Sequence, residues 1–318
     1  MATVVRRINR HKTFEVFYII VSIGIYLGYR QWQQNNLLIA ILLWVQTLLT
    51  VYVVDQTSKE PEKSAYDFVH SKKDRRGPTL VCLGDSITHA RCSSDWVSTI
   101  QPTLSRPLNV VNNGQNSITT YTTLQERVDW TLACEPDYVV ILIGTNDARA
   151  LVDWPWHWLE RACWGLPGPI TETSIEANLK GIVEKLLKKH NLQVAICTIP
   201  PLGEDLTTVW NQRAVKNVNA CIRKVASSAG SRVTLLDLYG ALESKIRQSA
   251  KTNSSAPSFF WGHVAWQTHG KQLFQLDWND MSRWIGNVVL TDAIHLNDTG
   301  GVIMNQLVVH WLLQQEHF

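Results

Sequence analysis

Short apolar runs alternate with long intervening segments through residues 79–318, and this alternation limits the fold more than any other feature of the sequence. The runs are rich in valine, isoleucine and leucine, as strands are when both faces of a sheet are covered. Two intervening segments, 175–187 and 303–312, carry apolar residues at the i, i+3/i+4, i+7 spacing of a helix. We therefore expect an α/β fold with a parallel sheet and helices on both faces. The strand-like runs are residues 80–83, 108–111, 138–143, 194–199 and 233–236.

The N-terminal part of the chain has a different character, because two apolar runs lie close together there. Residues 14–29 are apolar apart from Glu15, and residues 37–54 contain no charge. A transmembrane helix needs about 17 to 25 apolar residues, so the second run can span a bilayer and the first is at or below the lower limit. Two full spans or a shallow re-entrant hairpin would both place residues 14–54 in a lipid bilayer. A cleaved signal peptide is the competing interpretation, but no small-x-small site follows Tyr29.

Basic residues flank this hairpin on both sides. Residues 1–13 and 59–76 are rich in lysine and arginine, whereas Arg30 is the one basic residue in the link between the two runs. The positive-inside rule therefore predicts that both ends of the hairpin, and the domain that follows, face the cytoplasm. Residues 57–78 are charged and contain two prolines, which is typical of a linker. We expect a membrane hairpin with its basic flank at 1–56, a linker at 57–78 and an α/β domain at 79–318.

The composition excludes several classes of function. The formal net charge is only +3, and the basic residues gather beside the apolar runs rather than among aromatic residues, so we expect no nucleic-acid partner. The six cysteines show no CxxC spacing, and the ten histidines show no HxxxH or HExxH pattern. We therefore expect neither a disulfide framework nor a bound metal ion.

Polar residues follow three of the predicted strands, at the point where each strand ends. These segments are 84–86 (Gly-Asp-Ser), 112–114 (Asn-Asn-Gly) and 144–147 (Gly-Thr-Asn-Asp). Singly, each has the composition of an ordinary turn. In an open parallel sheet, however, the carboxyl ends of the strands form one edge at which ligands bind, so the three segments can converge. Ser86 lies between its strand and a segment with helical spacing, where a helix N-terminus can stabilise an oxyanion. The alternative is that residues 85 and 86 only cap that helix.

A nucleophilic serine needs a base and a residue that orients the base. Asp292 and His295 supply both within one short segment, just before the last predicted helix. Their three-residue offset lets the carboxylate reach one imidazole nitrogen while the other faces Ser86. A single histidine at a helix start is more often a cap or a surface residue, so the pair gains weight from the three strand ends. Together, the four segments predict acyl transfer.

In this order, the four segments resemble the sequence blocks of the SGNH (GDSL) hydrolase family. Ile87 stands where the family name has leucine, and Ser117 stands where a further glycine often follows in the second block. The resemblance covers roughly residues 79 to 315, and the ordered set is much more specific than any single tetrapeptide. The blocks correspond to Gly84–Thr88, Asn112–Gly114, Gly144–Asp147 and Asp292–His295.

The resemblance implies a flavodoxin-like three-layer α/β/α sandwich with a five-stranded parallel sheet, preceded in this chain by the apolar hairpin. It implies that Ser86 is the nucleophile, that His295 is the general base and acid, and that Asp292 holds His295 in the required tautomer. The oxyanion would be bound by the backbone N–H groups of Ser86 and Gly114 and by the side-chain amide of Asn146. It implies no metal or organic cofactor.

Aromatic segments outside these blocks bear on the substrate. Trp154, Trp156 and Trp158 lie in a proline-bounded connection that leaves the third strand end, and a second aromatic connection spans residues 253–290. Such residues wall an acyl pocket, enter a bilayer interface, or simply pack the domain interior. With the apolar hairpin, they favour a membrane-anchored serine ester hydrolase that acts on lipid or lysophospholipid-like acyl esters, with the three tryptophans at the substrate access.

Two other functions remain open at this level. A carbohydrate O-acetylesterase or acetyltransferase would need the opposite topology, and a glycan at the sequon that begins at Asn297 would crowd His295 in a secretory compartment. A non-catalytic membrane-tethered scaffold is the third function. The intact set of Ser86, Asn146, Asp292 and His295 argues against it.

Overall fold

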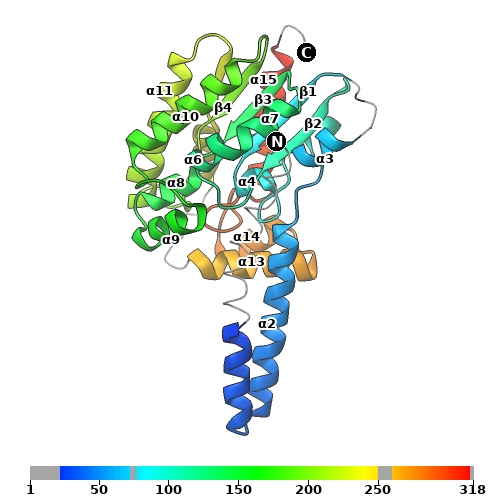
Figure 1. Ribbon diagram of the computed structural model, residues 1–318, viewed down its shortest axis with the longest axis vertical. Helices are drawn as coiled ribbons and strands as arrows, with labels where there is room; N and C mark the ends of the chain where they lie inside the picture. The colour runs from blue at the N-terminus through cyan, green and yellow to red at the C-terminus, as the bar shows by residue number, and fades with distance from the viewer. Residues whose placement is uncertain (1–21, 72–74, 76, 250–259, 316–318) are drawn as a thin grey trace. The chain divides into compact units, whose positions relative to one another are not determined.

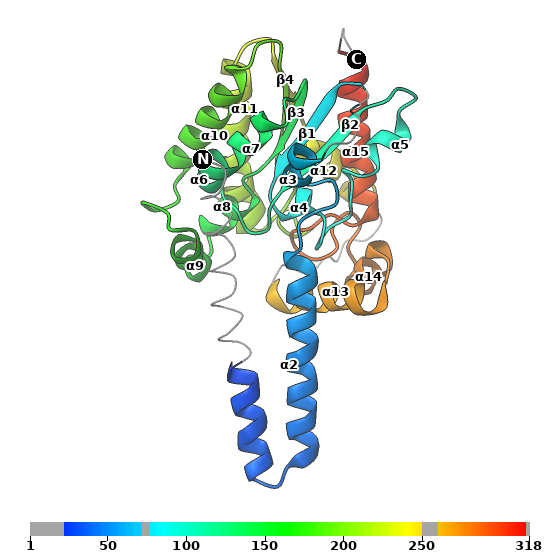
Figure 2. The ribbon, with the colours of Figure 1, turned by 45° about the vertical axis from the view of Figure 1, so that its right-hand side comes forward.

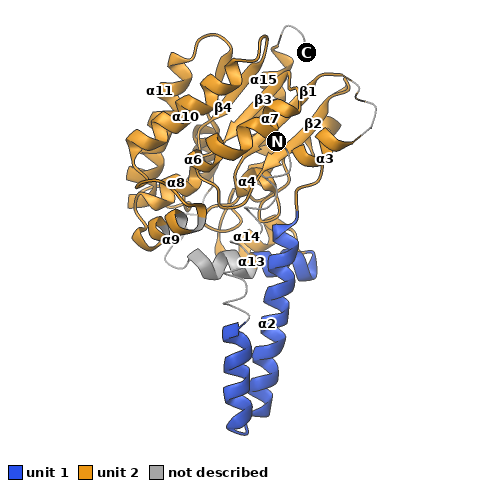
Figure 3. Cartoon of the chain, in the orientation of Figure 1, with its two compact units in different colours: residues 1–59, 268–275 blue, residues 60–267, 276–318 orange. Residues whose placement is uncertain are grey.

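The computed structural model describes residues 22–71, 75, 77–249 and 260–315 (Figure 1). It divides into two compact units (Figure 3). The first comprises Met1–Lys59 with Thr268–Gln275, and the second comprises Glu60–Gln267 with Leu276–Phe318. The apolar hairpin belongs to the first unit and the parallel sheet to the second, so the change in sequence character near residue 60 corresponds to a structural division.

The described part of the hairpin consists of two helices. Residues 22–33 are helical, a turn with Asn35 at φ 64° follows, and α2 (Leu37–Ser58) runs back beside the first helix (Figures 1 and 2). Among the described residues, α2 is the one helix that is long and apolar enough to span a membrane, and little of it is buried. The expected helical hairpin is therefore present in the described residues, and residues 14–21 of the first apolar run lie outside them.

Two glycines allow the hairpin helices to approach closely. A Cβ atom at Gly24 would collide with the side chain of Thr47, and one at Gly28 would collide with the indole of Trp44. The Trp44 Nε1–H also donates to the Ile25 carbonyl across the pair, at 3.4 Å. Small residues with this spacing bring helices together in membranes. A larger residue at either glycine would separate the two helices.

The second unit is built on a five-stranded, fully parallel sheet in the order β2-β1-β3-β4-β5. This flavodoxin-like order was expected from the resemblance. In the register of the sheet, Gly84 is paired with both Gly114 and Leu142, so the ends of these three neighbouring strands meet at one edge. The strands are β1 (Thr79–Gly84), β2 (Asn109–Gly114), β3 (Tyr138–Leu142), β4 (Gln193–Cys197) and β5 (Val233–Leu236).

Helices cover both faces of this sheet (Figures 1 and 2). One layer contains α7 (Val128–Ala133), α10 (Glu172–Leu187) and α11 (Lys216–Ser228). The other contains α5 (Ile100–Thr103), α12 (Leu238–Gln248) and α15 (Asp298–Leu313). Every residue of β1 and β3 is buried, which explains why these strands read as continuous apolar runs. The three-layer α/β/α fold is confirmed.

The segment after Ser86 differs from the expected long helix. Only four residues, Ser86–His89, form α4, which ends at Ala90 with φ 68°. The chain then turns toward the strand-like segment around Leu296: the Ser94 N–H donates to the Leu296 carbonyl at 2.9 Å. Trp96 returns to the core, where its indole N–H donates to the Ile87 carbonyl at 3.1 Å. The apolar spacing therefore reflects burial of an irregular segment rather than a helix.

The segment 57–78, which we expected to act as a linker, is partly ordered within the second unit. It contains α3 (Ala65–His70), and Ala65 at the start of this helix is buried. The Asn112 N–H donates to the Lys63 carbonyl at 3.0 Å, beside the end of β2. The assignment of residues 57–78 as a linker stays a prediction.

The two aromatic connections are helical rather than extended. The first contains α9 (Trp154–Trp164), with Pro155 in its first turn, where proline is tolerated. The second contains α13 (Phe260–Phe274) and α14 (Trp278–Ile285). The tryptophans at 154, 156 and 158, which we placed in a proline-bounded connection, therefore lie on α9; their role at the substrate access stays a prediction. The remaining elements are α6 (Thr120–Thr122), η1 (Thr123–Arg127), α8 (Thr145–Ala150) and η2 (Trp210–Val215).

Candidate active site

Ser86, His295 and Asp292 form a continuous hydrogen-bonded chain, although 209 positions separate the serine from the histidine. The Ser86 Oγ lies 2.9 Å from His295 Nε2, and His295 Nδ1 lies 2.7 Å from Asp292 Oδ2. All three side chains are at least nine-tenths buried. This is the geometry of a nucleophile, a base and a residue that orients the base.

Ser86 is placed by the tight turn between β1 and α4. Asp85 caps α4 by accepting the Ile87 N–H at 3.0 Å, which fixes the backbone around the serine. Burial raises the pKa of Asp85 to about 6, although the Ile87 hydrogen bond and the nearby His295 act in the opposite direction. The capping role that we weighed as an alternative is therefore performed by Asp85. Ser86 is directed to His295.

Asp292 and His295 lie in a short, closed loop before α15. The Thr291 N–H donates to the His295 carbonyl at 2.7 Å, and Leu290 and Leu296 form an antiparallel bridge. Inside this loop, Asp292 Oδ1 accepts the backbone N–H groups of Ile294 at 2.6 Å and His295 at 2.8 Å. One carboxylate oxygen therefore binds the loop backbone, and the other binds the imidazole.

The electrostatics of the pair favour the charged imidazolium. Burial alone would lower the pKa of His295, but the charge and hydrogen bond of Asp292 outweigh it, so the pKa is raised above 6.5. Burial would raise the pKa of Asp292, but His295 and the backbone N–H groups hold it below its ordinary value. A base with this partner can take a proton from serine and keep it during the reaction.

Asn146 and Asp147 hold the loop that follows β2. The Asn146 Nδ2 group donates to the Ile118 carbonyl at 3.0 Å. Asp147 accepts the Thr120 hydroxyl at 2.7 Å and the Thr120 N–H at 3.0 Å. Burial raises the pKa of Asp147 to about 6, against the opposing effect of these Thr120 bonds. Two adjacent residues of the third block thus fix the loop that follows the second block.

The backbone N–H of Gly114 is already engaged. It donates to Asn112 Oδ1 at 2.9 Å, while Asn112 Nδ2 donates to the Thr88 carbonyl at 2.7 Å. A Cβ atom at Gly114 would collide with the backbone of His89, so the glycine is required for the close approach of β2 to α4. Its role as an oxyanion donor stays a prediction, and its packing role is evident.

Ser117 takes the left-handed conformation, with φ 59°. L-residues with a side chain rarely adopt this conformation, which explains why glycine suits the position. Ser117 directly precedes Ile118, whose carbonyl accepts the Asn146 amide. Among the described residues, no hydrogen-bond partner of this N–H is found.

Two charged residues near the site had not been singled out from the sequence. Arg149 is buried on α8, lies 3.4 Å from Asp153, and opposes the rise in the pKa of His295. Glu204 is 4% exposed and accepts three backbone N–H groups of the segment before Asp292. Neither residue lies in a recognisable motif, so no local pattern in the sequence indicates it.

The tryptophans of α9 are largely exposed. Trp154 is 72% exposed and Trp158 is 54% exposed, and their rings meet edge to face with centroids 6.2 Å apart. The Arg161 guanidinium lies over the Trp158 ring, 5.7 Å from its centroid. The side chain of Trp156 lies outside the described part of the chain. For Trp154 and Trp158, packing in the domain interior does not hold.

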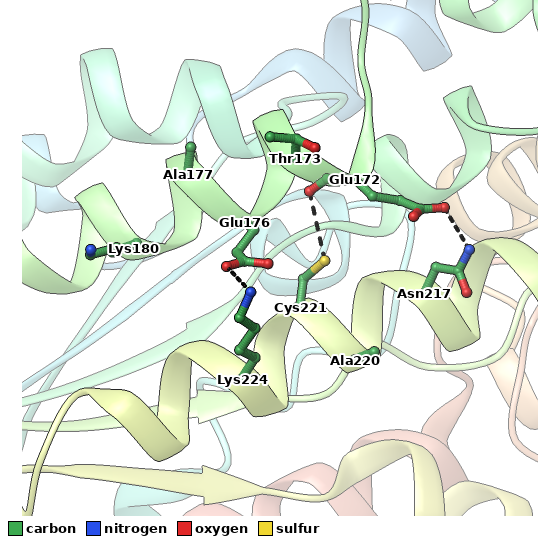
Figure 4. A pocket seen from close by; sticks show the side chains of 9 residues that line it. All are labelled: Glu172, Thr173, Glu176, Ala177, Lys180, Asn217, Ala220, Cys221 and Lys224. Atoms are coloured by element: carbon green, nitrogen blue, oxygen red, sulfur yellow. Dashed lines mark hydrogen bonds and ion pairs between the residues drawn. The ribbon is translucent and has the colours of Figure 1, made fainter.

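A pocket of about 610 Å³ lies between α10 and α11, and neither Ser86, Asp292 nor His295 lines it. Figure 4 shows the side chains that do. Its charged side chains are paired: Glu176 with Lys224 at 2.6 Å, and Glu172 with the Asn217 amide at 2.6 Å. Nothing in this pocket serves acyl transfer. Among the described residues, no group of three or more histidines, cysteines, aspartates or glutamates is placed to hold a metal ion.

Comparison with known proteins supports the arrangement. The model of the GDSL-like lipase/acylhydrolase family matches residues 82–300, which include all four blocks. No curated protein sequence matches the chain.

Solved structures share the fold at low sequence identity. A mutant of Axe2, an acetyl-xylooligosaccharide esterase from Geobacillus stearothermophilus, is 15% identical with a TM-score of 0.53, over 76% of this chain and 97% of that one. A lipase/acylhydrolase from Enterococcus faecalis is 19% identical with a TM-score of 0.50, over 74% and 95%. The acetyl xylan esterase AlAXEase is 20% identical with a TM-score of 0.51, over 74% and 100%.

Proposed function

Because the chain belongs to the GDSL-like lipase/acylhydrolase family and is a carboxylic ester hydrolase, we propose that Ser86, His295 and Asp292 are its catalytic triad. Ser86 Oγ attacks the ester carbonyl carbon while His295 Nε2 takes the hydroxyl proton. The tetrahedral intermediate collapses as the imidazolium protonates the leaving alcohol, which leaves an acyl group on Ser86. Water then attacks the acyl-enzyme with His295 again as the base, which releases the acid and restores the serine.

The oxyanion of the intermediate needs donors that are already oriented toward it. We propose the Ser86 N–H, the Gly114 N–H and the second N–H of the Asn146 amide for this role, with the Ser117 N–H as an alternative to that of Gly114. Asn146 uses one amide hydrogen on Ile118, which orients the other. The Ser117 N–H is the alternative because the Gly114 N–H donates to Asn112 in this structure.

A single observation carries the catalytic proposal: the 2.9 Å and 2.7 Å contacts that join Ser86, His295 and Asp292. The test is labelling with a fluorophosphonate probe, which reacts only with an activated serine. The wild type should be labelled and Ser86→Ala should not. Equal labelling of both proteins would remove Ser86 from the site.

We further propose that the protein is anchored in a bilayer by the hairpin and that the hydrolase unit faces the cytoplasm. The apolar α2 helix and the close packing at Gly24 and Gly28 support the anchor. The basic flanks support the orientation. Tags at residues 1 and 318 should then be digested by a protease added to the cytoplasmic side, while a tag near Asn35 should be protected if the hairpin crosses fully. Protection of both terminal tags would contradict this topology.

The surroundings of Asn297 support the same orientation. This residue is the glycosylation acceptor of the sequon, yet it is 1% exposed and caps α15 by accepting the Gly300 N–H at 3.0 Å. Its amide also donates to the Ser282 hydroxyl at 3.0 Å and to the Val288 carbonyl at 3.1 Å. A glycan on this nitrogen is incompatible with those bonds, so the fold is poorly suited to a glycosylating compartment.

For the substrate, we propose lipid or lysophospholipid-like acyl esters. The exposed indoles of Trp154 and Trp158 on α9 support this choice, because tryptophan side chains insert favourably into the headgroup region of a bilayer. Replacing Trp154, Trp156 and Trp158 by serine should spare hydrolysis of a short soluble ester and lower hydrolysis of a long-chain ester in vesicles, mainly through KM. Loss of both activities together with a fall in Tm would show that these residues only stabilise the fold.

An acetyl ester of a carbohydrate is the second candidate substrate. Two structural neighbours favour it, because one is an acetyl-xylooligosaccharide esterase and the other an acetyl xylan esterase. The chain-length profile decides between the two. A lipid hydrolase should prefer long p-nitrophenyl esters in vesicles over p-nitrophenyl acetate, whereas release of acetate from acetylated xylooligosaccharides at a higher kcat/KM would favour the carbohydrate substrate.

A further inference from the structure

Glu204 lies in the loop that follows β4, far along the sequence from the catalytic blocks. Its two carboxylate oxygens accept three consecutive backbone N–H groups: Val288 at 2.7 Å, Val289 at 2.7 Å and Leu290 at 2.8 Å. The segment 288–290 leads directly into Thr291 and Asp292. A buried carboxylate with three short bonds to one backbone segment holds that segment in one position.

The neighbouring residue strengthens the connection. The Gly203 N–H donates to the Ala293 carbonyl at 2.8 Å, on the other side of Asp292. Residues 203 and 204 therefore bind the catalytic loop both before and after Asp292. The loop between these two attachments contains the carboxylate that holds His295.

Asn211 in turn fixes the loop that carries Glu204. Its Oδ1 accepts the Leu202 N–H at 2.9 Å, and its Nδ2 donates to the carbonyls of Leu202 at 3.0 Å, Gly203 at 3.1 Å and Asp205 at 2.9 Å. Asn211 is buried at the start of η2. A rigid chain of hydrogen bonds thus runs from η2 through Glu204 to the backbone beside Asp292.

We propose that Glu204 is a positioning residue for the triad, which holds the 288–290 backbone so that Asp292 stays within hydrogen-bonding distance of His295. This inference rests on the proposed catalytic role of Ser86, His295 and Asp292. Burying a charge is costly unless it is fully hydrogen-bonded, and here the carboxylate accepts three backbone N–H groups that lie outside the helices and the strands of the sheet. The consequence is a fixed orientation of the base, which matters because small displacements of catalytic groups lower rates strongly.

The test variant is Glu204→Gln, which keeps the size of the side chain. Its amide nitrogen must face at least one backbone N–H, so one of the three bonds becomes a contact between two donors. The kcat for a soluble p-nitrophenyl ester should fall about 10- to 100-fold with KM nearly unchanged. The acid limb of the kcat/KM profile, which is the fall in kcat/KM at low pH, should move to lower pH than in the wild type. The reason is that a displaced Asp292 raises the pKa of His295 less than a correctly placed one. A purely structural role would change neither quantity per labelled active site.

Asp137→Asn is the matched control. Asp137 also accepts a backbone N–H with its carboxylate, from Thr79 at 2.8 Å, but it lies at the amino-terminal edge of the sheet, opposite the site. This variant should keep the wild-type kcat and acid limb. A fall in Tm for Glu204→Gln with unchanged kcat and pH profile would overturn the inference, as would equal changes in both variants.

Hydrogen exchange of the wild type gives a second test that does not depend on a folded variant. The N–H groups of residues 288–290 should exchange as slowly as those of β1, and exchange at the rate of an open loop would overturn the inference. The Ser86→Ala variant distinguishes failure of the proposed triad from failure of the positioning role of Glu204. If Ser86→Ala keeps activity, the proposed triad fails; if Ser86→Ala is inactive and Glu204→Gln behaves as the wild type, only the positioning role fails.

Discussion

Replacing Asp292 by asparagine should abolish most activity while keeping the loop intact. The asparagine Oδ1 can still accept the two backbone N–H groups that Asp292 accepts, from Ile294 and His295. Its amide nitrogen, however, would face His295 Nδ1 and donate to it. The imidazole proton would then lie on Nε2, which faces Ser86 and could no longer accept the serine proton. A triad with the wrong tautomer loses about 10⁴-fold in kcat, or about 5 kcal/mol of transition-state stabilisation.

The pH dependence of kcat/KM should change in a definite direction in this variant. The base must be neutral to act, and the pKa of His295 is raised, so the acid limb of the wild-type kcat/KM should lie above pH 6.5. In Asp292→Asn, burial remains and the carboxylate charge of Asp292 is gone, so the pKa of His295 should fall and the residual activity should have its acid limb at a lower pH than the wild type.

The stability of the fold should also depend on pH, through the protonation of His295 and Asp292. Because the folded pKa of His295 is raised, its protonation stabilises the fold below about pH 6.5, and this contribution is lost as the pH rises through the folded value. The depressed pKa of Asp292 stabilises the fold above about pH 3.9, and this contribution is lost as the pH falls through the folded value. Both dependences of Tm on pH should weaken in the variant.

The assay is a pH series of kcat/KM on a soluble p-nitrophenyl ester, with active sites counted by fluorophosphonate titration of the wild type. Asp280→Asn is the control, because Asp280 pairs with Arg283 on the exposed side of α14. This variant should change neither kcat nor the pH of the acid limb of kcat/KM. An acid limb at the same pH in wild type and Asp292→Asn, or a fall in kcat below tenfold, would refute the reasoning about the pair.

Three further predictions concern the oxyanion loop. Asn146→Ala should lower kcat about 100- to 1000-fold, about 3 to 4 kcal/mol, with the Tm little changed, as measured by steady-state kinetics; an unchanged kcat would exclude the amide. Ser117→Gly should keep activity and raise the free energy of unfolding by at most about 1 kcal/mol in urea titration, because glycine removes the cost of φ 59°; a loss of activity in this variant would contradict the expectation. Gly114→Ala should lower Tm by several degrees in calorimetry, since its Cβ would collide with His89, and an unchanged Tm would contradict the packing role.

Much of the fold could be predicted from the sequence, because buried parallel strands leave a continuous apolar signature. All six residues of β1 and all five of β3 are buried, and both strands were recognised as apolar runs. The helices α10 and α15 were recognised from one-sided apolar stripes. In contrast, the segment after Ser86 has helical spacing without being a helix, because Ser94 bonds to Leu296 and diverts the chain. Such a long-range bond has no local signal.

The same distinction applies to the site. Ser86, Asp292 and His295 could be recognised because each lies in a block with characteristic neighbours. Glu204 could not, since one acidic residue in a loop says nothing about the three N–H groups it meets 84 to 86 positions away. The occupation of the Gly114 N–H by Asn112 likewise depends on a side-chain rotamer. The helix α9 was not predicted, because tryptophans spaced two apart do not form the one-sided apolar stripe of a helix.

The central claim is that an acyl group passes through Ser86. The most direct measurement is a rapid acid quench of the wild-type enzyme during turnover of a p-nitrophenyl ester, followed by peptide mapping with mass spectrometry. We predict that the peptide containing Ser86 gains the mass of the acyl group in the wild type, and that the corresponding peptide of Ser86→Ala does not. An acyl group on a different residue, or hydrolysis by Ser86→Ala at the wild-type rate, would contradict it.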